Sequence, residues 1–335
     1  MKTSIVLTTI NNPNVVIKKI SEYSERNKWQ FIVIGDKKTP RNFKLNYGEF
    51  YSLKNQKKID LKFARICPLN NYARKNIGYL IAMKNSKVII ETDDDNIPNK
   101  DFFDERKLEH KVSSVKNKGW VNIYDFFLKK REFIWPRGVP LDELNNNLIH
   151  TKKKQNKKFF LQQNLCDKNP DVDSIYRIIN NNNININFKK KKISLGNSLS
   201  TFNSQNTTWF KHLFPLMYLP VTCTMRCTDI WRSIITLRIM HLNNDKILFN
   251  SPTVSQYRNP HDLINDFIDE IPMFENDKII YEALLNLSLK KGNENYANNM
   301  LKCYQKLIEL KIINKKEISF LEAWLYDIKR NTTNV

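Results

Sequence analysis

The chain has 335 residues, 41% of them hydrophobic and 11% aromatic, so it is long enough to bury one large core or two smaller ones. Only 7 glycines occur, and neither the G-x-x-x-x-G-K-S/T nor the G-x-G-x-x-G pattern is present, which argues against P-loop and Rossmann-type nucleotide binding. No apolar stretch approaches the length of a membrane span, and Met1 leads directly into a strand pattern, with no sign of a signal peptide.

The net charge of +21, from 55 Lys+Arg against 34 Asp+Glu, favours an anionic partner such as a nucleotide, nucleic acid or an acidic membrane face. AT-rich coding, which enriches Lys, Asn and Ile, explains the same excess without any partner. The 5 cysteines are scattered and form no zinc-site spacing, so we expect free thiols in a reducing cytoplasm.

The first hundred residues alternate between strand and helix patterns. In chain order the pattern predicts a strand over 4–9, a helix starting at 12–13, a strand over 31–34, a helix over 71–84 and a strand over 87–92. Such alternation indicates a mostly parallel sheet flanked by crossover helices.

The remainder of the chain reads differently. Residues 144–158 are rich in Asn and Lys and predict a solvated, mobile loop, and residues 180–192 form a second polar excursion. After about residue 259 the apolar residues recur at helical spacing to the end, as in Phe320, Trp324 and Ile328. We therefore divide the chain into a catalytic domain over 1–245 and a helical C-terminal extension over 246–335.

Three consecutive carboxylates, Asp93, Asp94 and Asp95, follow the apolar run Val88–Ile90. A buried strand that ends in an acidic turn places oxygens at the carboxyl edge of a sheet, where open α/β sheets bind ligands. Adjacent carboxylates repel one another unless a cation lies among them, and Mg²⁺ or Mn²⁺ prefers such ligands together with substrate phosphates. The pattern favours a metal-dependent enzyme that acts on a phosphorylated substrate, with a solvated acidic turn as the alternative.

Six segments in order resemble the STELLO-type glycosyltransferases of the GT-A fold and, more distantly, the reversibly glycosylated polypeptides and arabinopyranose mutases. They are VIGDKKTP at 33–40, RKNIGYL at 74–80, IETDDDN at 90–96, DVDSIYR at 171–177, FNSQNT at 202–207 and RCTDIWR at 226–232. The resemblance covers about residues 1–245, and it matches neither the loop at 144–158 nor the helical tail.

The resemblance implies a nucleotide-sugar donor, foremost a UDP-sugar, and a D-x-D motif that holds Mn²⁺ or Mg²⁺ against the donor diphosphate. It makes Asp95 the first candidate for a direct metal ligand, with Asp93 as a second ligand or a ribose contact, and it adds His261 as a late metal ligand. A lone histidine is also often structural. The candidate nucleotide-sugar contacts are Thr8, Thr9, Asp36, Arg74, Lys75, Asp93, Asp94, Asp173, Arg177, Asn203, Gln205, Arg226 and Arg232.

Asp229 is the candidate catalytic base. Arg226 and Arg232 lie three residues away on either side, so on a helix all three would share a face and the arginines would keep Asp229 ionised. An inverting transferase needs a carboxylate to accept the proton of the acceptor hydroxyl. A structural Asp–Arg bridge is the alternative. Asp173 and Arg177 form a similar i, i+4 pair that either contacts the donor sugar or braces a helix.

The acidic triplet and the resemblance together imply a cytoplasmic, metal-dependent glycosyltransferase with a glycan, lipid-linked or polysaccharide acceptor, and the basic charge would suit peripheral contact with the inner membrane face. A sugar-nucleotide-forming nucleotidyltransferase is the first alternative. Such enzymes usually carry a glycine-rich phosphate loop after the first strand, and residues 8–12 of this chain contain no glycine. A nucleic-acid-binding protein is the second, and it would have no use for a strand-end acidic triplet.

Overall fold

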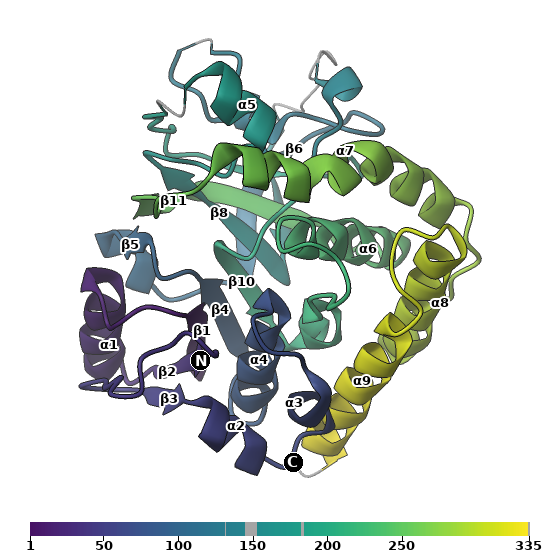
Figure 1. The fold of residues 1–335 in the computed structure, drawn as a ribbon. Coiled ribbons are helices and arrows are strands. Elements are labelled where there is room, and N and C mark those ends of the chain that lie inside the picture. Colours follow the sequence, from purple (N-terminus) through teal and green to yellow (C-terminus); the bar gives the residue numbers. More distant parts are fainter. Residues whose placement is uncertain (131, 145–152, 182–183, 334–335) are drawn as a thin grey trace.

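The computed structural model describes residues 1–130, 132–144, 153–181 and 184–333, which form an 11-stranded sheet with helices on both faces (Figure 1). The strands are β1 Thr3–Thr9, β2 Gln30–Gly35, β3 Glu49–Tyr51, β4 Val88–Thr92, β5 Asn96–Pro98, β6 Glu109–Ser114, β7 Gln155–Lys158, β8 Leu161–Asp167, β9 Lys192–Ser194, β10 Asn206–Phe210 and β11 Ile247–Gln256. The α-helices are α1 Val15–Asn27, α2 Leu53–Lys58, α3 Lys62–Ile66, α4 Lys75–Met83, α5 Ser174–Ile179, α6 Thr228–Leu242, α7 Leu263–Leu285, α8 Tyr296–Glu309 and α9 Glu317–Thr333. Short 3-10 helices cover Tyr72–Arg74, Lys100–Phe103, Ile123–Phe126, Leu141–Glu143, Lys211–Met217 and Asn293–Asn295.

The strand order is β3-β2-β1-β4-β10-β8-β11-β9-β6-β7, with β5 paired to β11. The strands β3, β2, β1 and β4 are parallel, as the alternation of strands and helices predicts. Beyond β4 the sheet is mixed, because β10 runs antiparallel to both of its neighbours and β9 and β5 run antiparallel to β11. The α/β prediction with flanking helices is confirmed, and the mostly parallel pairing holds for the N-terminal half of the sheet.

The two faces of the sheet are covered because both sides of its central strands are apolar. Ile5 and Leu7 of β1 pack against the buried stripe of α1, whereas Val6 faces the opposite layer with α4. Helix α1 begins at Val15, after Asn14 has capped it by accepting the N–H of Ile17, so the start predicted at residues 12–13 is two residues early.

The predicted loop over 144–158 is wrong at its C-terminal end. Gln155–Lys158 forms the edge strand β7, which pairs antiparallel with Glu109–Val112 of β6. Residues 145–152 lie outside the described part of the chain. Strand β11 lies C-terminal to residue 245 yet pairs with β8 and β9 in the sheet, so the helical tail starts at α7, and the domain boundary stays a prediction.

The C-terminal helices confirm the predicted helical extension, and the last of them, α9, packs against α3 and α4 of the N-terminal half (Figure 1). Asp327 of α9 accepts the backbone N–H groups of Lys62 and Phe63, at 2.9 and 2.8 Å, and so caps α3. The indole of Trp324, fully buried, donates to the carbonyl of Pro215 at 3.0 Å. The tail is therefore part of the same packed core as α3 and α4.

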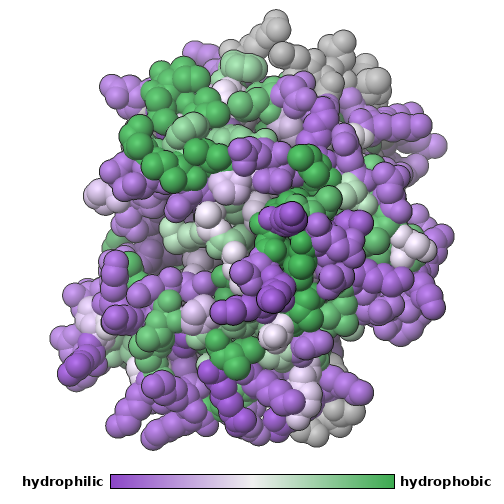
Figure 2. Space-filling model, turned by 45° about the vertical axis from the view of Figure 1, so that its right-hand side comes forward, coloured by the Kyte–Doolittle hydropathy of each residue, from purple (hydrophilic) through white to green (hydrophobic). Residues whose placement is uncertain are grey.

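The outer surface seen in Figure 2 is mainly hydrophilic, with hydrophobic areas between the polar ones. Several of the exposed hydrophobic residues are isoleucines of α5 and α7, namely Ile178, Ile179, Ile264, Ile268, Ile271 and Ile279. Among the described residues, no helix combines the length and hydropathy that crossing a bilayer requires.

Candidate active site

The acidic triplet lies directly after β4, at the carboxyl edge that β1, β2 and β4 share. Its middle member, Asp94, is turned toward the end of β1, where it accepts the hydroxyl of Thr9 at 2.5 Å and the side-chain amide of Asn11 at 2.9 Å. The amide of Asn14 donates to the Asp94 carbonyl at 2.6 Å. These bonds anchor the turn, with Asp93 and Asp95 on either side of Asp94. Thr8, the residue before the last one of β1, is half-buried.

Among the three aspartates, Asp95 gives the clearest indication that the site binds a cation. Its Oδ2 accepts from Nε2 of Gln256 at 2.8 Å, but its Oδ1 is buried and has no hydrogen-bond partner among the described residues. Burial raises the pKa of the Asp95 carboxyl to about 7, and the neighbouring Asp93 adds to the shift. A buried carboxylate oxygen without a partner is costly, and a divalent cation would satisfy it.

Asp93 is held by a buried lysine. Nζ of Lys75, fully buried, donates to Oδ1 of Asp93 at 2.8 Å, and the hydroxyl of Tyr72 donates to the same oxygen at 2.9 Å. Burial raises the pKa of the Asp93 carboxyl, and the Lys75 ammonium opposes that shift. The Lys75 ammonium therefore lies in the site with the triplet, and its contact with a donor phosphate remains a prediction.

No group of three or more His, Cys, Asp or Glu side chains placed to hold a metal occurs in the described part of the chain. Asp93 and Asp95 nevertheless fit a cation that takes one or two carboxylates and completes its shell with water and substrate phosphates. His261 lies near the start of α7, where its Nδ1 is 3.2 Å from Oδ1 of Asp266. Its role as a third ligand remains a prediction.

Asp36 and Arg74 hold the loop at 67–71 that leads into α4. The Asp36 carboxylate accepts the backbone N–H groups of residues 70–71 at 3.0 and 3.1 Å. The Arg74 guanidinium is buried and donates to the carbonyls of residues 67–68 at 3.0 and 3.1 Å. The nucleotide-sugar contacts expected of Asp36 and Arg74 remain predictions.

Asp229, in the first turn of α6, is fixed by an arginine that sequence reasoning missed. Nη2 of Arg137 lies 3.1 and 3.2 Å from the two Asp229 oxygens and also pairs with Asp171 at 2.9 Å. The backbone N–H and hydroxyl of Ser204 donate to Oδ2 of Asp229 at 3.1 and 3.2 Å. The carboxylate is therefore oriented from two sides by hydrogen-bond donors.

The predicted pairing of Asp229 with Arg226 and Arg232 is wrong. Helix α6 begins at Thr228, so Arg226 precedes it and pairs with Glu270 of α7. Arg232 is buried and makes a bidentate pair with Glu91 of β4, with both N–O distances 2.9 Å. These two arginines tie α6 to its neighbours, and Arg137 takes the place assigned to them beside Asp229.

Asp173 and Arg177 also have separate partners. Asp173 is the N-cap of α5, so it lies outside the helix, where it accepts the N–H of Tyr176 at 2.8 Å and the indole N–H of Trp135. Burial raises the pKa of Asp173 to about 6. Arg177 donates to Oδ1 of Asn169 at 2.5 Å. Both side chains brace the start of α5, and their contact with a donor sugar remains a prediction.

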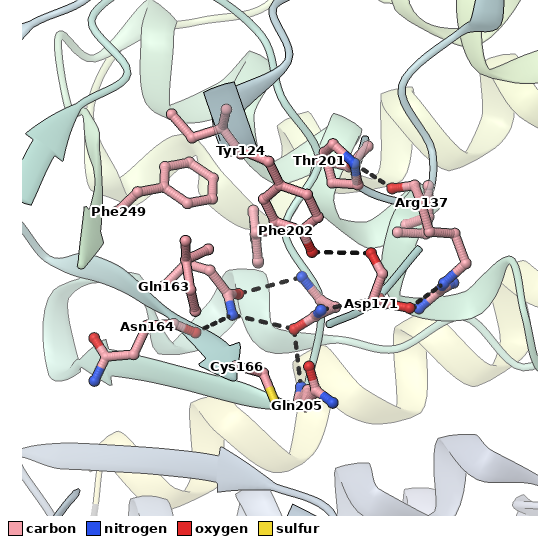
Figure 3. Close-up of a pocket in the computed structure, with 15 residues that line it drawn as sticks. Tyr124, Arg137, Gln163, Asn164, Cys166, Asp171, Thr201, Phe202, Gln205 and Phe249 are labelled. Carbon is pink, nitrogen blue, oxygen red and sulfur yellow. Dashed lines mark hydrogen bonds and ion pairs between the residues drawn. The ribbon is translucent and has the colours of Figure 1, made fainter. Parts of the chain in front are cut away.

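A polar cavity of about 20 Å³, room for about one water molecule, lies beside the Arg137–Asp171 pair (Figure 3). Nδ2 of Asn203 donates to Oδ2 of Asp171 at 2.9 Å, and Nε2 of Gln205 donates to Oδ1 of Asn96 at 3.0 Å. Asn203 therefore reaches the pair that holds Asp229, whereas Gln205 reaches the residue after the triplet.

Two hydroxyl groups connect the candidate base to the triplet. The Tyr72 hydroxyl, 2.9 Å from Asp93 Oδ1, lies 2.6 Å from the Ser204 hydroxyl, which donates to Asp229 at 3.2 Å. Burial raises the pKa of the Tyr72 phenol well above its usual range, so it stays protonated. The structure thus brings together Asp93, Lys75 and Asp229, which the sequence places on three separate elements.

Comparison with known proteins gives a consistent result. The family model of STELLO glycosyltransferases matches residues 226–334. Two Arabidopsis thaliana proteins, probable glycosyltransferases STELLO2 and STELLO1, are 24% and 25% identical over 97% and 90% of this chain. The chain spans less than half the length of either relative, at 44% and 41%.

Among solved structures, GalNAc-T7 with UDP, GalNAc and Mn²⁺ aligns over 98% of this chain and 57% of its own, with a TM-score of 0.36 and 13% identity. A likeness at that level carries no functional argument. The two relatives match along nearly the whole chain and the family model matches its C-terminal part, so the chain is similar to the STELLO-type glycosyltransferases.

Proposed function

We propose that this chain is a divalent-metal-dependent glycosyltransferase that moves a sugar from a nucleotide-sugar donor, foremost a UDP-sugar, to a hydroxyl of a glycan or lipid-linked acceptor. The observation that carries the proposal is the buried, unpartnered Oδ1 of Asp95, together with the hydroxyl chain that joins the triplet to Asp229. The similarity to STELLO glycosyltransferases supports the class of reaction.

Asp95 and Asp93 would hold Mn²⁺ or Mg²⁺, and the bound cation would supply Lewis-acid stabilisation of the leaving nucleoside diphosphate. Lys75 holds Asp93 in place through its 2.8 Å contact and adds positive charge to the region where the diphosphate develops negative charge. Thr9 and Asn11 fix the turn between these two carboxylates by binding Asp94.

Asp229 acts as the general base. The acceptor oxygen forms a bond to the anomeric carbon, the bond from that carbon to the diphosphate oxygen breaks, and the acceptor proton passes to the Asp229 carboxylate. Arg137 and Ser204 orient that carboxylate, and the imidazole of His261 remains a candidate contact to the cation.

The setting we propose is the cytoplasm, at the inner face of a membrane. All five cysteines are free, which fits a reducing compartment, and the net charge of +21 would attract anionic lipid. The same charge would favour an acceptor that carries a phosphate-linked lipid.

The test is a thermal-shift panel of nucleoside diphosphates with and without Mn²⁺. A ligand at 100 times its Kd stabilises the folded state by about 2.7 kcal/mol, so UDP with Mn²⁺ should raise the melting temperature of the parent protein more than either alone. Asp95→Ala should lose this joint effect. Asp101→Asn, at an exposed carboxylate that pairs with Lys190, is the matched control and should retain it.

If no nucleoside diphosphate stabilises the parent in the presence of Mn²⁺, the proposed function is refuted. If Asp95→Ala responds to UDP and Mn²⁺ as the parent does, the metal assignment fails even though nucleotide binding stands.

A further inference from the structure

A second cavity, of about 510 Å³, opens at the carboxyl ends of β8 and β11. Pockets of 300–1,000 Å³ are the usual size for small-molecule sites. The antiparallel strand β10 separates β4 from β8, so β8 and β11 point in the same direction as β4. The cavity and the acidic triplet therefore share one edge of the sheet.

The cavity wall is attached to the triplet. Gln256, which lines the cavity, donates its side-chain amide to Asp95 at 2.8 Å, and the backbone N–H of Tyr257 donates to the Asp95 carbonyl at 3.2 Å. A molecule in the cavity would thus lie beside the candidate metal ligand. Two candidate nucleotide-sugar contacts, Thr8 and Asp36, lie at the ends of β1 and β2, on the other side of β4 in the strand order.

The lining has the chemistry of a carbohydrate site. Amide side chains are contributed by Asn169, Asn185 and Gln256, and hydroxyl groups of a sugar can both donate to and accept from amides. Tyr257 is 61% exposed, and its ring offers a flat apolar surface with a polar tip. Such a ring can pack against the C–H face of a pyranose while the amides bind its edge.

One of the lining residues, Arg258, is a buried arginine with unused hydrogen-bonding capacity. Arg258 is only 7% exposed at its side chain and pairs with Asp266 at 2.5 Å. Its Nη1 is buried and has no hydrogen-bond partner in the described part of the chain. Since buried polar atoms are nearly always satisfied, this nitrogen indicates an acceptor group that is supplied by a ligand or an ordered water.

We propose that this cavity is a carbohydrate-binding subsite that receives the sugar of the acceptor, with Tyr257 as its stacking surface. Its role as the acceptor site rests on the proposed function, whereas carbohydrate binding itself does not. The placement beside Asp95 would bring an acceptor hydroxyl to the same edge as the donor diphosphate.

The experiment is saturation-transfer NMR on the full chain with the methyl glycosides of glucose, galactose, mannose and xylose as probes. We expect saturation transfer to at least one of them. Tyr257→Ala should weaken that binding by about threefold to tenfold, the usual effect of one aromatic contact, and Tyr257→Phe should retain it. Tyr326→Ala, which removes a 42% exposed tyrosine on α9, is the matched control and should bind as the parent does.

The affinity for UDP with Mn²⁺ is measured on the same four proteins. The proposal is overturned if none of the glycosides receives saturation, if Tyr257→Ala binds them as well as the parent does, or if that variant loses UDP affinity instead, which would assign the cavity to the donor. Glycoside binding that depends on Tyr257 in a protein that binds no nucleoside diphosphate would support the subsite and refute the glycosyltransferase proposal.

Discussion

Replacing Arg232 with methionine should destabilise the protein far more than the loss of a surface ion pair, because it leaves the carboxylate of Glu91 buried without its cation. Glu91 is fully buried and Arg232 is 1% exposed at its side chain. The two charge-assisted bonds between them, each 2.9 Å, would both be lost. The Trp209 indole, at 2.8 Å, and the Tyr79 hydroxyl would remain as neutral donors to Glu91.

Breaking one partner of a buried pair typically costs about 3–5 kcal/mol, because the remaining charge keeps its desolvation penalty. We expect a loss of that size in the free energy of unfolding for Arg232→Met. The double variant Glu91→Gln, Arg232→Met should lose less than the single variant, since no buried charge remains. The same pair joins β4, which carries the triplet, to α6, which carries Asp229, so the single variant should also reduce turnover.

The measurement is urea unfolding of the parent and both variants at neutral pH. Arg26→Met is the matched control: Arg26 pairs with Glu22 on the surface of α1, at 63% and 55% exposure, and such pairs contribute about 0–1 kcal/mol. If Arg232→Met loses no more stability than Arg26→Met, or if the double variant is the less stable of the two, the argument from buried charge is refuted.

Two further predictions concern single carboxylates. Asp229→Asn should bind UDP and Mn²⁺ as the parent does yet turn over about 10²–10⁴-fold more slowly, and near-normal turnover would exclude Asp229 as the base. Burial raises the pKa of the Asp277 carboxyl well above its usual range, so the folded protein keeps a proton there that the unfolded chain releases. The free energy of unfolding should therefore fall as the pH rises from about 4 through that raised pKa. Asp277→Asn keeps an oxygen that can accept the 2.8 Å bond from the Trp231 indole, and it should remove that part of the pH dependence. The measurement is urea unfolding of the parent and the variant at about pH 5 and about pH 8. If the free energy of unfolding differs between the two pH values as much in the variant as in the parent, the reasoning is contradicted.

The parts of the site that follow from local pattern could be predicted from the sequence. The apolar run Val88–Ile90 predicts β4, which ends at Thr92, so the triplet that follows directly lies at the edge of the sheet. The i, i+3 spacing of Tyr72 and Lys75 would have signalled that both can reach one neighbour, and both do contact Asp93.

The contacts that depend on tertiary packing could not be predicted. Arg137 reaches Asp229 across 92 positions of the chain, and nothing in its local sequence indicates that partner. The shared helix face proposed for Asp229 and its neighbouring arginines failed because α6 begins two residues after Arg226. The edge strand β7 is Gln-Asn-Lys-Lys, which has no apolar alternation, because an edge with Lys side chains needs no buried face and resists pairing with other chains.

The cap that α9 places on α3 can form only late in biosynthesis, because α9 is at the C-terminal end of the described chain. Asp327 follows Lys62 by 265 residues, so at about 5–20 residues per second the ribosome adds it roughly 13–50 s later. Throughout that interval the first turn of α3 lacks its acceptor, and the apolar surface that Trp324 covers is open to water or to other nascent chains. Completion of the N-terminal half of this protein therefore waits on α9, and the delay is a natural point for chaperone binding or for aggregation.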